Sequence, residues 1–149
     1  MLNYLLRNAS IDDKQAICNY KIDTIVRGNE ISDSEKEKIS KYINESLIEH
    51  LKDYKIIMVE DEFAGIFCMY LINNGHDYLL DEIYLIDKYR KKGIATSLVK
   101  NSIKEAQSLK KDLYLWVYKS NTNAINIYKK SGFKIVNETD TRYQMVFTV

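Results

Sequence analysis

The stretch DEIYLIDKYRKKGIATSL, residues 81–98, decides the fold that we predict for this chain. It joins an apolar strand to a polar turn and then to a helix that begins at Gly93. Backbone N–H groups at a helix N-terminus have no partners inside the helix and carry about half a positive charge, so they suit a diphosphate. The basic residues 90–92 add positive charge, and the small residues Gly93 and Ala95 leave room for a phosphate. The stretch therefore predicts a phosphate-binding turn.

The neighbouring segments predict how this strand and helix are built into a sheet. We predict a strand at residues 78–86, a helix at residues 93–109 and a second strand at residues 113–118. Two parallel strands need a long crossover connection, and this helix supplies one. The strands around Leu85 and Leu115 are therefore predicted to be parallel neighbours.

The rest of the chain alternates between short β-rich runs and amphipathic helical runs. This order predicts the α+β class with a mixed sheet. The chain has no internal repeat, no linker and no Pro, so we expect one domain over residues 1–149. The further elements are strands at residues 4–8, 55–59 and 63–72, a helix after Ser10 or Asp12, a helix from Asp33, a helix at residues 123–131, and a final hairpin of residues 133–136 and 142–147.

Composition and charge exclude several classes of protein. The chain has 46% hydrophobic and 29% charged residues, as ordinary globular proteins do. Its formal net charge of +1 argues against a general nucleic-acid binder, so no nucleic-acid partner is expected. No stretch approaches the roughly 18 apolar residues of a membrane span, so we expect no membrane anchor. Cys18 and Cys68 lack metal-ligand spacing, which favours buried, reduced thiols, no metal site and a cytoplasmic location.

Two short motifs carry a resemblance to a known family. The run EIYLIDKYRKKGIA, residues 82–95, closely resembles the acetyl-CoA signature of the GNAT acetyltransferase superfamily, in which Q/R-x-x-G-x-G/A follows a strand. The resemblance implies acetyl-CoA as co-substrate and a single-domain GNAT-like fold, with a mixed, mostly antiparallel sheet, a central parallel strand-helix-strand unit and helices on both faces. It assigns Arg90, Lys91, Lys92, Gly93, Ile94 and Ala95 to the pyrophosphate, and Tyr84, Leu85 and Ile86 to the pantetheine arm.

The second motif is SNTNAINIYKKSGF, residues 120–133, which resembles the family pattern N-x-x-A-x-x-x-Y-x-x-x-G-F. Asn121 and Tyr128 are separated by about two helical turns, so they can project to the same side of a helix. Taken alone, Asn121 could be only a helix N-cap and Tyr128 only a core aromatic residue. The resemblance implies instead that Asn121 contacts the pantetheine region and that Tyr128 is the general acid near the thioester sulfur.

Transfer to an amine needs a base, an acid and a group that polarises the thioester carbonyl. Glu82 is the first candidate base, because it lies on the strand that the resemblance assigns to the cofactor. Asp81, Glu30 and an ordered water are the alternatives, and each carboxylate could equally be a solvated surface group. A backbone N–H near Leu85 or Ile86 is the candidate for polarising the carbonyl.

Together the motifs predict an N-acetyltransferase that moves an acetyl group from acetyl-CoA directly to a primary amine of a small molecule or peptide. The loops at residues 27–31 and 73–77 are expected to form the acceptor wall, because loops on a rigid scaffold carry specificity. A non-catalytic acyl-CoA sensor and a transferase acting on aminoacyl-tRNA are the alternatives, and a homodimer stays open. The sensor could dispense with Tyr128, and the tRNA enzyme should show a basic face.

Overall fold

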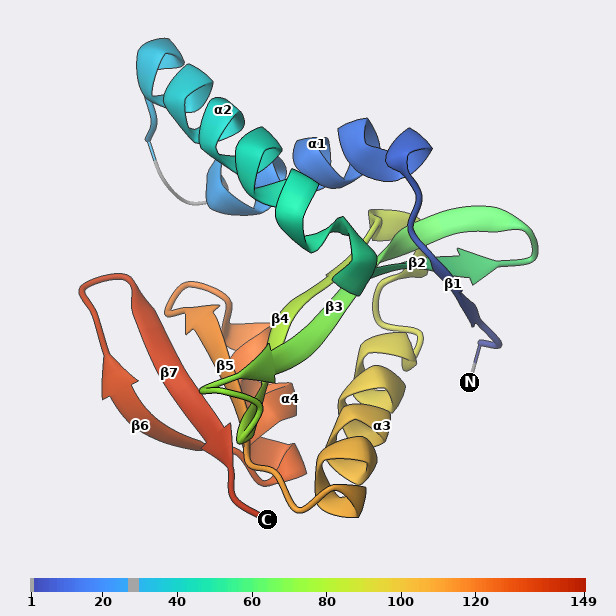
Figure 1. The fold of residues 1–149 in the computed structure, drawn as a ribbon, viewed down its shortest axis with the longest axis vertical. Helices are drawn as coiled ribbons and strands as arrows, with labels where there is room; N and C mark the ends of the chain where they lie inside the picture. Colours follow the sequence, from blue (N-terminus) through green and yellow to red (C-terminus); the bar gives the residue numbers. More distant parts are fainter. Residues whose placement is uncertain (1, 27–29) are drawn as a thin grey trace.

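One mixed β-sheet forms the centre of the protein. The computed structural model describes residues 2–26 and 30–149. In this part of the chain seven strands lie in the order β1-β2-β3-β4-β5-β7-β6, with β4 and β5 parallel and the other neighbours antiparallel (Figure 1). The strands are β1 (Leu5–Asn8), β2 (Tyr54–Val59), β3 (Glu62–Ile72), β4 (Asp77–Leu85), β5 (Leu113–Tyr118), β6 (Lys134–Glu138) and β7 (Arg142–Phe147).

Two helices cover each face of this sheet. The side chain of Ser32 accepts a hydrogen bond from the N–H of Glu35 at 3.3 Å, and this N-cap starts the helix that follows it. On one face lie α1 (Lys14–Val26) and α2 (Asp33–His50), and on the other lie α3 (Ile94–Ser108) and α4 (Thr122–Ser131) (Figure 1).

Each face of the sheet has its own apolar core. Side chains alternate between the two faces along a strand, so neighbouring residues of β2 belong to different cores. Ile56 is buried with Ile17 of α1 and Leu47 of α2. Ile57 is buried with Leu98 of α3. The sheet therefore separates a face covered by α1 and α2 from a face covered by α3 and α4.

The parallel strands β4 and β5 separate soon after they meet. They pair over only two residues each, ending at Leu79 and Tyr114. Within the described residues no ladder joins them beyond this point, although β4 continues to Leu85. The predicted parallel pair is confirmed, but it does not include Leu85 and Leu115, because the strands have separated before these residues. We call this feature the β4–β5 divergence.

Strand β4 is also irregular on the side that pairs with β3. The ladder with β3 passes from Leu80 to Glu82 and leaves Asp81 as an extra residue, which is a β-bulge. Further along, β3 and β4 approach so closely that a Cβ atom on Gly65 would lie 1.9 Å from the carbonyl oxygen of Tyr84. Only glycine fits there, and it holds the end of β4 tightly against β3.

The predicted fold class is confirmed, and element boundaries lie within two residues of the predictions. The helix predicted at residues 123–131 begins one residue earlier, at Thr122. Cys18 and Cys68 are buried free thiols, as expected. No helix among the described residues has both the length and the apolar character that crossing a membrane requires.

Candidate active site

The turn before α3 has the backbone shape of an anion-binding site. Gly93 immediately precedes the helix at φ +87°, and Lys91 has φ +58°, so both adopt the left-handed conformation. The N–H of Ser97 donates to the carbonyl of Gly93 at 3.1 Å, which leaves the amides of Ile94 and Ala95 without acceptors inside the helix. Gly93 and Lys91 are exposed. These features suit the pyrophosphate turn expected from the sequence.

The side chain of Arg90 is bound within the protein. Its Nε donates to the carbonyl of Leu85 at 2.7 Å, and its Nη1 lies 2.8 Å from the Asp87 carboxylate. The guanidinium also lies over the ring of Tyr84, 5.2 Å from its centre. Arg90 therefore ties the turn to the end of β4, whereas Lys92 is exposed. Contact of Arg90 and Lys92 with a pyrophosphate stays a prediction.

The three residues expected along the pantetheine arm have different surroundings. Leu85 is buried in the core beneath α3. Tyr84 lies toward α1, where its hydroxyl donates to Asp23 at 2.9 Å. The N–H of Ile86 donates to the carbonyl of Ala64 at 2.9 Å, so this amide already has an acceptor. The Ile86 amide is therefore not available to polarise a thioester carbonyl, whereas the other amide that the sequence suggested, that of Leu85, stays a prediction.

The second motif forms the beginning and middle of α4. Asn121 is the N-cap of this helix, and its Oδ1 accepts a hydrogen bond from the N–H of Ala124 at 3.2 Å. Its capping role is thus confirmed, and its contact with a cofactor stays a prediction. Tyr128 is half-buried against the core on the α3 side, with its ring 5.6 Å from that of Phe133.

Glu82 is a carboxylate in a poorly hydrated place on β4. Its side chain is 15% exposed. Loss of hydration raises the pKa of Glu82 to about 7, while the ammonium of Lys21 opposes this rise and the Asp81 carboxylate adds to it. A carboxylate that titrates near neutral pH is well suited to accept a proton there.

Tyr128 and Glu82 interact electrostatically. Burial raises the pKa of Tyr128 far above its ordinary value, and the negative charge of Glu82 raises it further. The phenol therefore keeps its proton throughout the neutral range. Glu82 on β4 can accept a proton and Tyr128 on α4 can supply one, and the charge of the first acts on the second.

Sequence reasoning missed Lys21 on α1. Its Nζ donates to the Tyr54 hydroxyl at 2.7 Å and lies 3.8 Å from both the Asp81 and the Glu82 carboxylates. One signal was available in the sequence. Lys21 follows Ile17 by four residues, so it continues the stripe of α1 that faces the sheet, where a charged residue is unusual.

The other candidate residues are not gathered at this place. Glu30 is exposed, and the part of the expected acceptor wall at residues 27–29 lies outside the described residues. The turn at residues 73–77 lies at the start of β4, the opposite end of the strand from Gly93, and its Gly75 carbonyl accepts a hydrogen bond from Lys111. This position offers no support for an acceptor wall beside Glu82.

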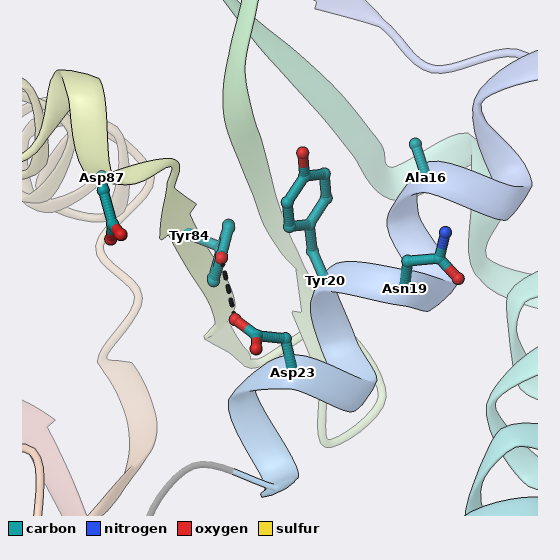
Figure 2. A pocket seen from close by; sticks show the side chains of 6 residues that line it. All are labelled: Ala16, Asn19, Tyr20, Asp23, Tyr84 and Asp87. Carbon is teal, nitrogen blue, oxygen red and sulfur yellow. Dashed lines mark hydrogen bonds between the residues drawn. The ribbon is translucent and has the colours of Figure 1, made fainter.

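A pocket of about 490 Å³ opens between α1 and the end of β4. Figure 2 shows Asp23 of α1 pointing toward Tyr84 of β4, with the hydrogen bond from the Tyr84 hydroxyl to Asp23. The ring of Tyr20 lies 4.7 Å from that of Tyr84. The pocket is lined by Ala16, Asn19, Tyr20, Asp23, Tyr84 and Asp87.

The described residues hold no group of three or more His, Cys, Asp or Glu that could bind a metal ion.

Comparison with known sequences gives similar proteins over most of the chain. The sequence profile of the acetyltransferase (GNAT) family matches residues 20–133. An N-alpha-acetyltransferase from Sulfurisphaera tokodaii is 30% identical over an alignment of 152 residues, which covers 89% of this chain and 81% of that protein. An N-alpha-acetyltransferase from Saccharolobus solfataricus is 31% identical over 156 residues, covering 90% of this chain and 82% of that protein.

Comparison with solved structures gives the same architecture. The crystal structure of PaiA N-acetyltransferase from Thermoplasma acidophilum, in complex with coenzyme A, matches with a TM-score of 0.78 at 18% identity. The match covers 99% of this chain and 100% of that chain. At this identity the likeness shows a shared fold.

Proposed function

Because this chain belongs to the acetyltransferase (GNAT) family, we propose that it transfers the acetyl group of acetyl-CoA to the α-amine of a peptide or protein N-terminus. One observation carries the proposal. Burial raises the pKa of Glu82 to about 7 and raises the pKa of Tyr128 well above its ordinary value, and the charge of Glu82 acts on Tyr128. A pair whose surroundings drive the two pKa values apart is suited to act as base and acid in one reaction.

The backbone features fit acetyl-CoA as the co-substrate. The amides at the start of α3, with Gly93 in the left-handed conformation, suit the pyrophosphate. The β4–β5 divergence leaves backbone groups of β4 without ladder partners from β5 among the described residues, and an extended amide chain such as pantetheine can use such groups. In this arrangement Glu82 accepts a proton from the acceptor amine, and Tyr128 donates one to the departing sulfur.

The acidity of the acceptor supports an α-amine over a side-chain amine. An α-amino group has a pKa of about 8, whereas a lysine amine has about 10.4. A base of pKa about 7, as Glu82 has, is better matched to the first. The similar proteins from Sulfurisphaera tokodaii and Saccharolobus solfataricus, both called N-alpha-acetyltransferase, also support this acceptor class.

A thiol-release assay across a panel of acceptors tests the proposal directly. We expect coenzyme A release with peptides that carry a free N-terminus, and little with the same peptides blocked at the N-terminus but containing lysine. Spermidine and aminoacyl-tRNA are included as the small-amine and nucleic-acid alternatives. Release only with aminoacyl-tRNA or spermidine would overturn the acceptor class, and no release with any acceptor would favour a non-catalytic acyl-CoA sensor.

Acetyl-CoA is expected to raise the melting temperature of the protein. A ligand that binds only the folded state stabilises it by about 2.7 kcal/mol at a concentration of 100 times its dissociation constant. Differential scanning fluorimetry with acetyl-CoA and with ADP, as a control for nucleotide binding alone, measures the effect. An unchanged melting temperature at millimolar acetyl-CoA would contradict the proposed co-substrate.

Replacing Gly93 with Val is expected to weaken acetyl-CoA binding about tenfold or more, because a side chain at this turn blocks a phosphate from the helix amides. The φ of +87° also makes Val unfavourable at this position, by about 1–2 kcal/mol. Gly75→Val is the matched control, since Gly75 has φ +82° and a Cβ there meets nothing within 4 Å.

Both variants should therefore lose similar thermal stability. Only Gly93→Val should lose affinity for acetyl-CoA, measured by calorimetric titration. Equal affinity in the two variants would mean that the phosphate turn has been assigned to the wrong place.

The cellular location remains a prediction. Buried free thiols at Cys18 and Cys68 are compatible with a reducing compartment, which supports the cytoplasm. Fractionation of cells that express the tagged protein tests this location.

A further inference from the structure

The side chain of Lys21 on α1 lies close to Glu82, the candidate base on β4. Lys21 projects from α1 toward the sheet, and its side chain is only 21% exposed. Its Nζ lies 3.8 Å from an oxygen of Glu82 and 3.8 Å from an oxygen of Asp81. These distances are longer than a hydrogen bond, so the ammonium acts on both carboxylates mainly through its charge.

A hydrogen bond to Tyr54 holds the Lys21 ammonium in this position. The ammonium donates to the hydroxyl of Tyr54 on β2 at 2.7 Å, and Tyr54 is buried. The ring of Tyr54 also lies 5.4 Å from Nζ. A flexible lysine is therefore held by β2 while its remaining N–H groups face the carboxylates of β4. This anchoring reduces the entropy that an exposed pair would lose on forming.

The groups around Glu82 are otherwise neutral or acidic. Asp81 on β4 adds a negative charge, Cys68 on β3 and Tyr54 on β2 are buried neutral groups, and Tyr128 on α4 is a neutral phenol on which the charge of Glu82 acts. Among residues 2–26 and 30–149, Lys21 is the cation that acts on Glu82. Without it the poorly hydrated Glu82 carboxylate would face the negative charge of the exposed Asp81 with no cation beside it, and would be expected to take up a proton.

On the proposed function, we propose that Lys21 is a positioning residue that keeps the Glu82 carboxylate ionised and in place as the general base. Its role is to set the lower end of the pH range in which the enzyme works. The β-bulge at Asp81 contributes to this arrangement. It brings the carboxylates of two successive residues of β4 to within 3.8 Å of the Lys21 ammonium.

Lys21→Met tests this role by removing the charge and keeping most of the side-chain length. An opposite charge within about 4–6 Å typically shifts a carboxyl pKa by one unit or more. The rise of kcat/KM with pH is therefore expected to move about one unit toward alkaline pH, with a loss of roughly fivefold at pH 7 that largely recovers at pH 9. The α-amine of the peptide titrates equally in every variant, so the difference between variants reports on the enzyme.

Two control variants separate charge from packing. Lys21→Arg keeps the charge and should give a pH profile close to that of the parent. Lys14→Met removes a cation from the first residue of the same helix, about 10 Å along the axis from Lys21, and should leave the profile unchanged. A profile for Lys21→Met that falls equally at all pH values would overturn the proposal, because it would indicate a purely structural role.

Direct titration of Glu82 makes the test independent of catalysis. In protein labelled with ¹³C at the glutamate carboxyl, the Glu82 resonance is assigned by its loss in Glu82→Gln. Its midpoint should rise by about one pH unit or more in Lys21→Met and stay near the parent value in Lys21→Arg. An unchanged midpoint would overturn the role of Lys21, whether or not the parent transfers acetyl groups. A shifted midpoint in a parent without transferase activity would instead reject the proposed function alone.

Discussion

Replacement of Tyr128 by Phe is expected to lower the turnover number by about 10²- to 10⁴-fold, the usual contribution of a general acid. The variant keeps the aromatic ring and its contact with Phe133, and it removes only the hydroxyl. Affinity for acetyl-CoA should change little, so the loss should appear in kcat and kcat/KM alike. Turnover, acetyl-CoA affinity and melting temperature are measured on the same preparation.

The matched control for this experiment is Tyr114→Phe on β5. Tyr114 is half-buried like Tyr128, and it lies on a strand and not on α4. We expect near-parental turnover from it. If Tyr128→Phe also turns over at the parental rate and only its stability changes, then Tyr128 is a core aromatic residue and has no part in the chemistry.

Replacement of Glu82 by Gln should have an effect of similar size, about 10²- to 10⁴-fold in kcat/KM at neutral pH. The amide cannot accept a proton from the acceptor amine, so the step in rate that is expected of the parent around pH 7 should be absent from the variant. Glu62→Gln is the control, because Glu62 is an exposed carboxylate at the start of β3 that pairs with Lys88 and accepts a hydrogen bond from Tyr89. An intact pH step in Glu82→Gln would assign the base to Asp81 or to water.

The same variant has a consequence for stability. Burial raises the folded-state pKa of Glu82 to about 7 from an ordinary value of 4.5, so the folded protein holds this proton more tightly than the unfolded chain. The resulting stabilisation is present below pH 4.5 and is lost as pH rises through about 7. Glu82→Gln should lack this part of the pH dependence, which urea unfolding at pH 5 and pH 8 can measure.

Local patterns in the sequence were sufficient to predict most of the fold. Alternating apolar residues and the turn at Gly93 predicted the strand, the helix and their parallel connection, because these features depend on neighbours along the chain. The early separation of β4 from β5 and the bulge at Asp81 were not predictable in this way. Both depend on how three strands fit together in space, and no local pattern of residue types records them.

The candidate site also has features that local sequence motifs predicted and features that they did not. Glu82 and Tyr128 were found from the sequence, since their motifs are local. The interaction between them was not predictable, because it joins residues that are far apart in the chain. The hydrogen bonds made by the side chain of Arg90 and by the amide of Ile86 were not predictable for a related reason. Each group has a partner in β3 or β4 that only the folded structure supplies.

The β4–β5 divergence also has a consequence for the hydrogen exchange of backbone amides. Hydrogen exchange of backbone amides is slow where a ladder protects them and faster where it does not. Among the described residues, the edges of β4 and β5 beyond Leu79 and Tyr114 have no ladder with each other, although both strands lie inside the strand order of the sheet. Such edges invite pairing with another extended backbone. A ligand with an extended chain of amides, such as pantetheine, could form hydrogen bonds with these strand edges. Its binding would then slow hydrogen exchange of the backbone amides at the C-terminal end of β4, and the slowing could be measured for each residue.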